Sequence, residues 1–274
     1  EVSVHRTKLS VIRMTYEEAD AQKDSPALAP LFAIAEKNRI RRENAGAVSI
    51  DFPEVFITLA EQDGTKQAQV QPVVHTEASA MIKEMMLLAG EAAARFAFQH
   101  SIPFQYISQE APELPNKLPS GLAGEYRKRR AMRPRSVGTI PSMHAALGLA
   151  MYGQVTSPLR RYGDLVSHRQ LLNYIDGKQL TPVADLILKI AAGDVAGRAC
   201  VSAERASRQH WTLVYLLQNP DWRGTAVVLE AMGKKAHVFI PSLGYEGDIT
   251  LDAEPELNQE LTVKVRRIRL AYLQ

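Results

Sequence analysis

Cysteine is almost absent from this 274-residue chain, in which Cys200 stands alone. A single cysteine excludes an internal disulfide and a zinc site built from several thiolates, and it is typical of a reducing compartment. Long apolar runs are also missing, since no stretch approaches the roughly 20 residues of a membrane span. Residues 1–8 hold no apolar signal core. We therefore expect a soluble, cytoplasmic protein without membrane contacts.

An excess of charge of one sign is also lacking. The 33 Lys and Arg residues stand against 30 Asp and Glu, which leaves a net charge of +3. Global charge is therefore a weak indication of a nucleic-acid partner. Hydrophobic residues make up 46% of the chain and charged residues 23%, a composition that excludes the disordered class. At this length we expect one large domain, or a large and a small one.

Helical patterns dominate the chain up to residue 218. The first predicted helix begins at residue 15. Further helices are predicted over 28–44, 76–100, a stretch after His144, 164–175 and 183–217. The last of these is either one helix or two, with possible breaks at Gly193 and Gly197. Strands are predicted over 2–14, 48–52, 55–59 and 68–74, with a hairpin turn at Asp63-Gly64. We expect the 76–100 helix to be buried around much of its circumference. The proline-containing 102–119 segment should be an extended surface connection.

After Asn219 the pattern changes to short strands. These are predicted over 223–229, 236–240, 247–251 and 261–268. Short strands at regular spacing after a helix-rich region indicate a separate small barrel. We therefore place a domain boundary near Asn219, which gives domains of residues 1–218 and 219–274.

Six basic residues fall close together between Gly121 and Arg135. Among them, Arg127 and Arg130 are candidates for guiding a phosphate backbone. The run is equally compatible with a solvated surface, because Tyr126 is the only aromatic residue among these cations.

The most informative segment is 156–169, with the sequence T-S-P-L-R-R-Y-G-D-L-V-S-H-R. Its proline predicts a turn, after which Arg160 and Arg161 lead into a helix. Adjacent side chains cannot share one direction, so one arginine can face a cleft while the other braces the fold. A planar guanidinium suits the oxygens of a phosphate. The alternative is a structural ion-pair network with Asp164 or Glu84.

This segment is similar to the signature of the RNase II (RNB) family, whose members are processive exoribonucleases that degrade single-stranded RNA from its 3′ end. The likeness extends to earlier segments, namely Arg13–Glu18, Gly46–Glu54, Glu77–Ala89 and His144–Leu149. Together these segments cover most of residues 1–218. The resemblance implies that this part is an RNB-type catalytic domain without its N-terminal metal-binding segment.

The resemblance also implies roles for single residues. Arg160 would be catalytic and would stabilise the charge that develops at the scissile phosphate. Glu84 would accept hydrogen bonds from ribose hydroxyls of the terminal nucleotides, and Glu204 would face the end of the RNA channel. Arg161 and Tyr162 would contact RNA, and the other polar residues of the segment would mainly brace it.

Both acids have a structural alternative. Glu84 would then form an ion pair with Arg161 or with neighbours of Lys83, and Glu204 would be an ordinary acid on a helix surface.

The family reaction requires a divalent metal ion, implied to be Mg²⁺, held by an aspartate-rich motif near the start of the catalytic domain. No such cluster occurs in this sequence, and hydrolysis with two metal ions requires several carboxylates. We therefore expect no metal ligand in this chain. Because the chain begins at Glu1 without an initiator methionine, we expect the aspartates in an upstream segment of the same protein.

Residues 219–274 resemble the five-stranded OB-fold RNA-binding module that follows the catalytic domain in this family. The resemblance implies a phosphate groove with a stacking platform, formed by residues that include Lys234, Lys235, Phe239 and Arg266. In the alternative, Phe239 lies in the barrel core and the lysines are solvated.

These observations predict an α+β fold, with a mixed α/β RNB-type catalytic portion followed by a small OB barrel. The expected function is 3′-to-5′ hydrolysis of single-stranded RNA to nucleoside monophosphates by a monomer that uses metal-activated water. The leading alternative is a noncatalytic RNA-binding or regulatory protein that retains the fold. A third alternative, a basic scaffold for proteins, would show no preference for RNA.

Overall fold

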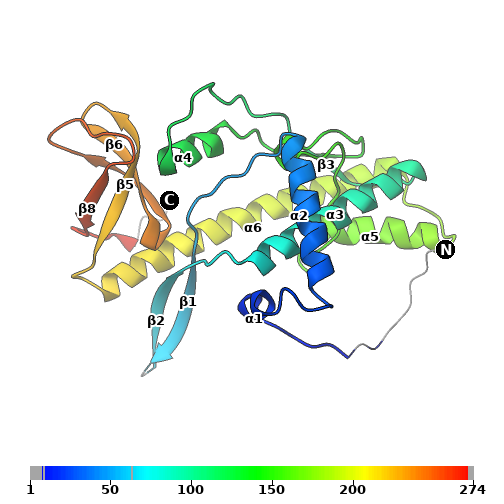
Figure 1. Ribbon diagram of the computed structural model, residues 1–274, viewed down its shortest axis with the longest axis horizontal. Coiled ribbons are helices and arrows are strands. Elements are labelled where there is room, and N and C mark those ends of the chain that lie inside the picture. The colour runs from blue at the N-terminus through cyan, green and yellow to red at the C-terminus, as the bar shows by residue number, and fades with distance from the viewer. Residues whose placement is uncertain (1–7, 9, 63, 271–274) are drawn as a thin grey trace. The chain divides into compact units, whose positions relative to one another are not determined.

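The computed structural model describes residues 8, 10–62 and 64–270 (Figure 1). Contacts divide the chain into two compact units. The first consists of the chain up to Ser49 with His75–Pro112 and Met132–Arg198, and the second of Ile50–Val74, Glu113–Ala131 and the chain from Ala199 onward. The sequence-based boundary near Asn219 follows the change from helices to strands. The contacts also assign three earlier stretches to the second unit, namely Ile50–Val74, Glu113–Ala131 and residues 199–218.

The first unit begins with two helices that lie where the sequence predicts them. In helix α1 (Tyr16–Ala21), the Thr15 hydroxyl accepts a hydrogen bond from the Glu18 backbone, and the Glu18 carboxylate accepts one from the Thr15 backbone. Helix α2 (Ala29–Asn44) ends just before Gly46, whose φ is 86°. Residues 10–14 of the predicted 2–14 strand have no regular secondary structure. Residues 2–7 and 9 of that prediction lie outside the described residues.

Helix α3 (Glu77–Gln99) lies where the sequence predicts it, packs against α2 and is capped by Thr76. The expectation of burial around its circumference is wrong. Its buried positions recur about every third residue, at Ala78, Met81, Glu84, Leu87, Gly90, Glu91, Ala94 and Ala97. Ile82 and Phe98 are exposed. The prediction failed because apolar residues also occupy positions of this helix that face solvent.

The first part of the segment after α3 contributes to the core, so the predicted surface connection is wrong for residues 102–108. Four residues of this part are less than 5% exposed, namely Ile102, Phe104, Tyr106 and Ile107. Residues 110–119 have no helix or strand and are mostly exposed, as that prediction requires. Strand β3 (Tyr106–Ser108) pairs antiparallel with β4 (Ser136–Gly138). Proline fixes an extended backbone but does not prevent the burial of its neighbours, so the prolines indicated the conformation and not the location.

A short 3₁₀ turn (η1, Ala145–Leu147) replaces the apolar helix predicted after His144. Gly148 ends the turn with a φ of 64°, a conformation that favours glycine. A Cβ atom at this position would lie 2.4 Å from the carbonyl oxygen of Arg42. This close approach to the end of α2 cannot be seen in the local sequence pattern.

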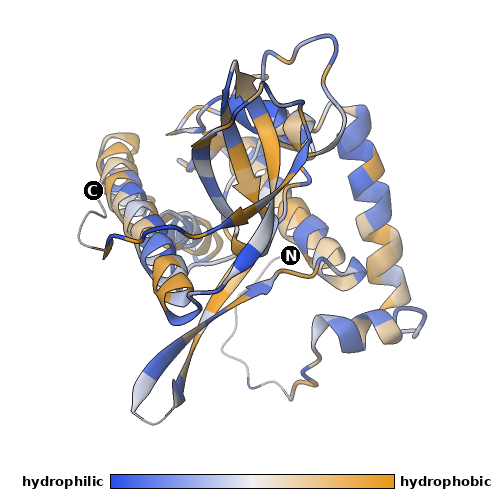
Figure 2. Cartoon of the chain, turned by 90° about the vertical axis from the view of Figure 1, so that its left-hand side faces the viewer, coloured by the Kyte–Doolittle hydropathy of each residue, from blue (hydrophilic) through white to orange (hydrophobic). Residues whose placement is uncertain are grey.

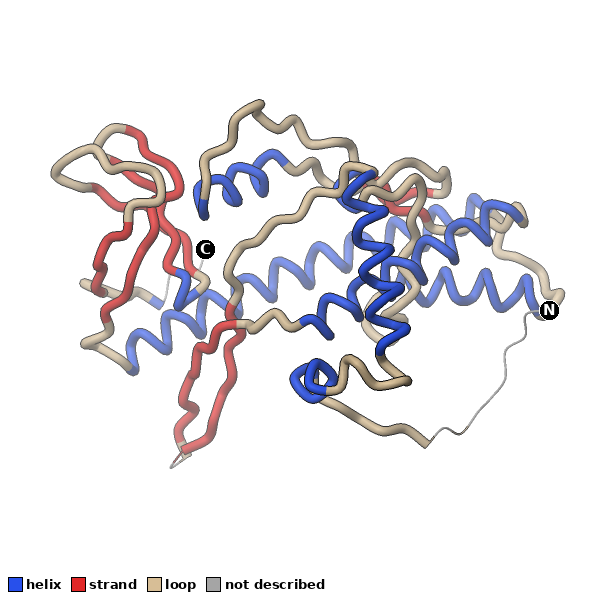
Figure 3. The backbone as a smooth tube through the Cα atoms, in the orientation of Figure 1, coloured by secondary structure: helices blue, strands red, loops and turns tan. Residues whose placement is uncertain are grey.

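Helices α5 (Tyr162–Ile175) and α6 (Val183–Gln218) follow. Helix α6 is continuous, so neither Gly193 nor Gly197 breaks it. Its residues up to Arg198 belong to the first unit and the rest to the second. Figure 3 shows these helices together with the long loops that follow α2 and β3.

The second unit contains a β-hairpin and helix α4 (Gly121–Ala131). Strand β1 (Val55–Gln62) pairs antiparallel with β2 (Thr65–Pro72), with Gln62 opposite Thr65. The strand predicted over 48–52 is absent, and residues 47–54 have no regular structure. Phe52 from this stretch packs instead on the Phe239 ring, with 4.5 Å between the ring centroids.

A four-stranded antiparallel sheet completes the second unit, in the order β7-β6-β5-β8. Its strands are β5 (Arg223–Met232), β6 (Lys235–Ile240), β7 (Tyr245–Thr250) and β8 (Glu260–Lys264). A short 3₁₀ turn (η2, Pro241–Leu243) precedes β7. One face of the sheet forms a core around Ala226, Val228, Ala236 and Val238, and Figure 2 shows hydrophobic residues along these strands. The four predicted strands are confirmed, but the described residues do not confirm a five-stranded barrel.

Candidate functional site

The 156–164 segment forms a turn that leads into α5. The Ser157 carbonyl oxygen accepts hydrogen bonds from the backbone N–H groups of Arg160, at 3.2 Å, and Arg161, at 3.0 Å. The Asp164 carboxylate is fully buried. It accepts hydrogen bonds from the Ser157 backbone at 2.8 Å and from Arg161 Nη2 at 2.7 Å. Asp164 therefore links the backbone of Ser157 at the start of the turn to the side chain of Arg161 at its end.

The two adjacent arginines differ in their surroundings. Arg161 is half-buried and pairs with Asp164, one of the two partners weighed for it from the sequence. Arg160 is exposed, and within the part of the chain that the structure describes its side chain has no hydrogen-bond or ion-pair partner. One arginine braces the turn while the other is available to an anion. A catalytic role for Arg160 stays a prediction.

Buried polar atoms without a partner are concentrated in the same segment. Among the described residues, these atoms include Asp164 Oδ1, Arg161 Nε and Ser167 Oγ. Buried polar groups are normally hydrogen-bonded, so such a cluster calls for an additional partner such as ordered water. The turn that presents Arg160 thus rests on polar groups whose hydrogen-bonding capacity is only partly used.

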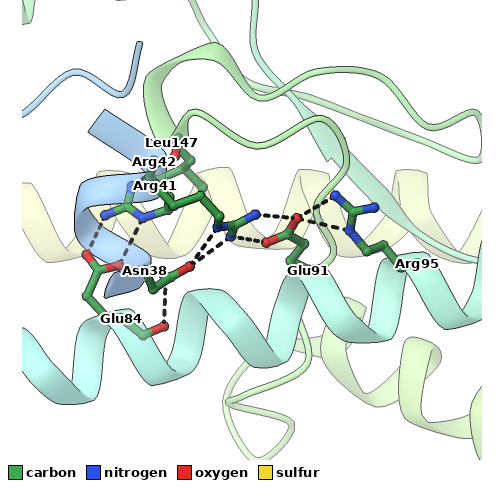
Figure 4. Close-up of polar contacts among 7 residues, drawn as sticks. All are labelled: Asn38, Arg41, Arg42, Glu84, Glu91, Arg95 and Leu147. Carbon is green, nitrogen blue, oxygen red and sulfur yellow. Dashed lines mark hydrogen bonds and ion pairs between the residues drawn. The ribbon is translucent and has the colours of Figure 1, made fainter. Parts of the chain in front are cut away.

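Glu84 lies on the buried face of α3 and is 3% exposed. Its Oε2 accepts hydrogen bonds from Arg42 Nε at 2.9 Å and Asn38 Nδ2 at 2.8 Å, and its Oε1 accepts one from Arg42 Nη2. Arg42 Nη1 also donates to the Leu147 carbonyl oxygen at 2.9 Å (Figure 4). Neither of the ion-pair partners weighed from the sequence is the one found. The RNA contact of Glu84 stays a prediction.

A second carboxylate continues this polar network along α3. Glu91 accepts hydrogen bonds from Arg41 Nη1 at 3.1 Å and from Arg95 Nη2 at 2.8 Å. Asn38 joins the two parts, because its amide oxygen accepts a hydrogen bond from Arg41 Nη2 at 2.8 Å while its nitrogen donates to Glu84 (Figure 4). Burial raises the pKa of Glu91, but the two arginines outweigh it and lower the pKa below the ordinary range.

The other predicted contacts of the first unit and of helix α6 are accessible. Tyr162 is 47% exposed at the start of α5. Glu204 is exposed in the part of α6 that belongs to the second unit, where Arg208 Nη2 lies 3.3 Å from its Oε1. This pairing agrees with the surface-acid alternative and leaves the carboxylate open to solvent.

The basic helix α4 divides its cations between structure and solvent. Arg127 is exposed, and Arg130 is exposed while its guanidinium donates to the Tyr126 hydroxyl at 3.2 Å. Arg129 pairs with Glu246 at 2.6 Å and lies over the Phe52 ring, 4.4 Å from its centroid. Arg127 and Arg130 are thus the two arginines of α4 that are exposed to solvent, which a contact with a phosphate backbone would require.

Lys234, Lys235 and Arg266 are exposed in the second unit. Phe239 is only 2% exposed and packs against Tyr126, Leu229 and Phe52. Its expected role as a stacking platform is therefore corrected, because a ring in the core offers no face to a base. The alternation of β6 places this side chain on the face that α4 covers.

Sequence reasoning missed a charged cluster in the second unit. The two ring nitrogens of His237 lie 2.7 Å from Asp248 Oδ1 and 3.3 Å from Glu246 Oε2. Burial lowers the pKa of His237, but the hydrogen bonds to the two carboxylates outweigh it and raise the pKa above its ordinary value. The only signal in the sequence was a histidine in the predicted 236–240 strand and two acids at or next to the following predicted strand, 247–251.

The residues of the described part do not fit a metal centre. Within residues 8, 10–62 and 64–270, no group of three or more His, Cys, Asp or Glu side chains is gathered as metal coordination requires. Helices in the same ranges include none that is both long enough and apolar enough to cross a membrane.

The RNB domain family model matches residues 4–119 and 123–177. The chain belongs to the RNB domain family. The resemblance seen in the 156–169 segment is thereby confirmed, and the match includes Glu84, Arg160, Arg161 and Tyr162 but ends before Glu204.

Curated relatives are ribonucleases. The chain is 35% identical over 226 residues to an uncharacterized ribonuclease of Synechocystis sp., an alignment that covers 77% of this chain and 33% of the relative. It is 27% identical over 194 residues to the chloroplastic/mitochondrial ribonuclease II of Arabidopsis thaliana, covering 68% of this chain and 24% of that protein. The chain thus spans a third or less of the length of these relatives.

Solved structures share the fold at low sequence identity. An active-site mutant of the Dss1 exoribonuclease from Candida glabrata matches with a TM-score of 0.80 and 20% identity, covering 94% of this chain and 37% of that one. Mycoplasma genitalium RNase R, in complex with ribose-methylated single-stranded RNA, matches with a TM-score of 0.72 and 15% identity, covering 90% and 48%. Yeast Ssd1, a pseudonuclease, matches with a TM-score of 0.63 and 18% identity, covering 87% and 35%.

Proposed function

We propose that this protein is a 3′-to-5′ exoribonuclease that hydrolyses single-stranded RNA to nucleoside monophosphates. The observation that carries the proposal is the contrast between Arg161, which is bound to the buried Asp164, and Arg160, which is exposed without a partner in the described part of the chain. Three findings support RNA as the substrate class. The chain belongs to the RNB domain family, its relatives are ribonucleases, and its fold is similar to that of an RNA-bound RNase R.

The chain's own residues would bind and orient the RNA. Arg160 would hold the oxygens of the scissile phosphate, with its position set by the turn that Asp164 fixes, and would stabilise negative charge as it develops there. The carboxylates of Glu84 and Glu204 would interact with the RNA end, and Glu84 would have to share its oxygens with Arg42.

The family reaction uses Mg²⁺, which would supply an activated water molecule. The described residues do not hold it, so we propose that the aspartates come from an upstream segment of the same protein. We also propose that the sheet of the second unit is part of an OB-type RNA-binding module, with Lys234, Lys235 and Arg266 on the phosphate backbone. The protein would act as a cytoplasmic monomer.

A second candidate is a noncatalytic RNA-binding protein that retains the RNB fold. The observation that favours it is the lack of a metal-ligating cluster within the described ranges, and the fold is shared with a pseudonuclease. Both candidates predict RNA binding, and they differ only in whether RNA is shortened.

A time course on 5′-labelled single-stranded RNA tests the proposal. The full-length protein is incubated with Mg²⁺ or with EDTA, and shortening from the 3′ end that requires Mg²⁺ is the expected result. Intact RNA that still shifts in a binding assay would favour the second candidate.

Substitution of Arg160 tests the observation itself. We expect Arg160→Ala to lower the rate by roughly 10²-fold or more with little change in RNA affinity. Arg39→Ala removes a half-buried arginine of the same unit, whose ion pairs within the described residues are with Glu36 and Glu43, and it should leave the rate unchanged. Equal rates for the two variants would remove Arg160 from the reaction.

A further inference from the structure

A groove of about 300 Å³ lies between helices α5 and α6 of the first unit. It is lined by Tyr162, Leu165, Val166, Arg169, Thr181 and Lys189. The first of these residues follows the two arginines of the signature directly, but Arg160 and Arg161 do not line the groove. The groove is therefore a separate surface beside the proposed catalytic turn.

The charges of this groove are positive and uncompensated. Arg169 and Lys189 are both exposed, and neither has an ion-pair or hydrogen-bond partner from its side chain in the ranges that the structure describes. None of the lining residues is acidic. The nearby Asp164 is fully buried and bound to Arg161, and Asp185, one turn before Lys189 on α6, makes no ion pair with it. Two free cations facing one groove favour an anion.

The groove also presents an aromatic ring. Tyr162 is 47% exposed, and its ring lies against α6 at Gly193. A Cβ atom at Gly193 would lie 3.0 Å from Cδ1 of that ring, so the glycine allows this close approach. An exposed ring that lies against a neighbouring helix is suited to stacking with a nucleobase. Val166 is only 7% exposed and provides an apolar floor.

We propose that this groove binds one nucleoside monophosphate unit, with the base stacked on Tyr162 and the phosphate held by Arg169 and Lys189. The unit is either a nucleotide of a bound RNA strand or a free nucleoside monophosphate, and both share the same phosphate and base. As a subsite for the RNA strand, the groove deepens the proposed function and rests on it. As a site for the free nucleotide, it does not require that function.

Lysine acylation tests the site directly. The full-length protein is treated with an amine-reactive acetylating reagent, alone or with AMP, single-stranded RNA or inorganic phosphate, and peptide mass spectrometry follows Lys189. We expect AMP and RNA to slow the modification of Lys189 severalfold. Lys178 serves as the internal control, because it is exposed but pairs with Asp176 outside the groove. Its modification should not change.

Substitutions provide the matching binding measurement by calorimetry with AMP. Lys189→Gln and Tyr162→Leu should each weaken AMP binding by about tenfold. Tyr162→Phe should retain affinity because it keeps the ring, and Lys178→Gln should bind as tightly as the unsubstituted protein. Protection by inorganic phosphate equal to that by AMP would overturn the nucleotide assignment, because the base would then contribute nothing.

The failure of this inference can be told from the failure of the proposed function. RNA that binds the unsubstituted protein and both groove variants equally well, while neither RNA nor AMP protects Lys189, overturns the groove and leaves the exoribonuclease proposal standing. Protection by AMP in a protein that binds no RNA supports the groove as a site for a free nucleotide and overturns the proposed function. Protection by RNA but not by AMP supports the strand subsite.

Discussion

Arg42 and Glu84 form a buried ion pair between α2 and α3, although 42 positions separate them in the chain. Both side chains are less than a tenth exposed, and Arg42 also donates to the carbonyl oxygen of Leu147. One guanidinium therefore ties two helices to the η1 turn. This arrangement explains why a carboxylate in the middle of α3 is tolerated at a buried position, since a buried charge requires a partner.

Removal of one partner of this pair should destabilise the protein strongly. We expect Arg42→Leu to lower the free energy of unfolding by about 3–5 kcal/mol, because it leaves the Glu84 carboxylate buried without its cation. Chemical denaturation followed by circular dichroism measures the change. The double variant Arg42→Leu, Glu84→Leu should lose less than the sum of the two single variants. Strict additivity would contradict the coupling.

Two glycines with nearly the same φ angle allow backbone strain to be separated from the steric crowding of a new Cβ atom. Gly148 and Gly177 have φ values of 64° and 65°, so alanine at either site costs about 1–2 kcal/mol of conformational strain. Only at Gly148 would the new Cβ meet a backbone atom, the Arg42 carbonyl oxygen, while nothing lies within 4 Å at Gly177. Gly148→Ala should therefore lower the melting temperature clearly more than Gly177→Ala. Equal losses of melting temperature would show that the backbone can move to relieve the contact between a Cβ at position 148 and the Arg42 carbonyl oxygen.

The raised pKa of His237 predicts a pH dependence of stability. Folding favours the protonated imidazole, so its stabilisation is fully present below the ordinary histidine pKa and is lost as the pH rises through the raised folded-state value. Unfolding free energies measured at increasing pH should fall between the ordinary histidine pKa and the raised folded-state value. The fall should be smaller in His237→Gln. His75→Gln, at an exposed position, is the control and should keep the full dependence.

His144 should act in the opposite direction. Burial lowers its pKa, and a backbone hydrogen bond only partly offsets this effect. Folding therefore favours the neutral ring, and stability is lost as the pH falls below the ordinary histidine pKa toward the lowered value. Among the described residues its Nδ1 atom is buried without a hydrogen-bond partner, which is consistent with a group that is costly to charge. We expect His144→Asn to reduce the loss of unfolding free energy below the ordinary histidine pKa. An unchanged loss in this variant would contradict the assignment.

The salt dependence of RNA binding tests the second unit. Lys234 and Lys235 are exposed at the start of β6, and the proposed function places both on phosphates. Replacement of both by glutamine should reduce the slope of log affinity against log salt by about 1.4 for single-stranded RNA. Lys66→Gln, with an exposed lysine of the β1–β2 hairpin, is the control. An unchanged slope in the double variant would mean that these lysines do not contact the backbone.

The sequence by itself determined the local elements and the family. Helices α1, α2, α3, α5 and α6 and the four strands after Asn219 follow from periodicity, capping residues and turn residues, which act over a few neighbouring positions. The different surroundings of Arg160 and Arg161 also have a local cause. They are adjacent, and Asp164, the partner that separates them, is three positions from Arg161. The 156–169 segment was specific enough to indicate the family.

Only the tertiary structure decided which residues are paired or buried over long distances in the chain. The Arg42–Glu84 pair, the burial of Phe104 and the core position of Phe239 all depend on segments that meet in space but are far apart in sequence. The His237 cluster depends on the pairing of β6 with β7, which brings together side chains that are 9 and 11 positions apart. A local pattern reports which side chains are apolar or charged. Which of them face each other is set by packing and by the need of each buried charge for a partner.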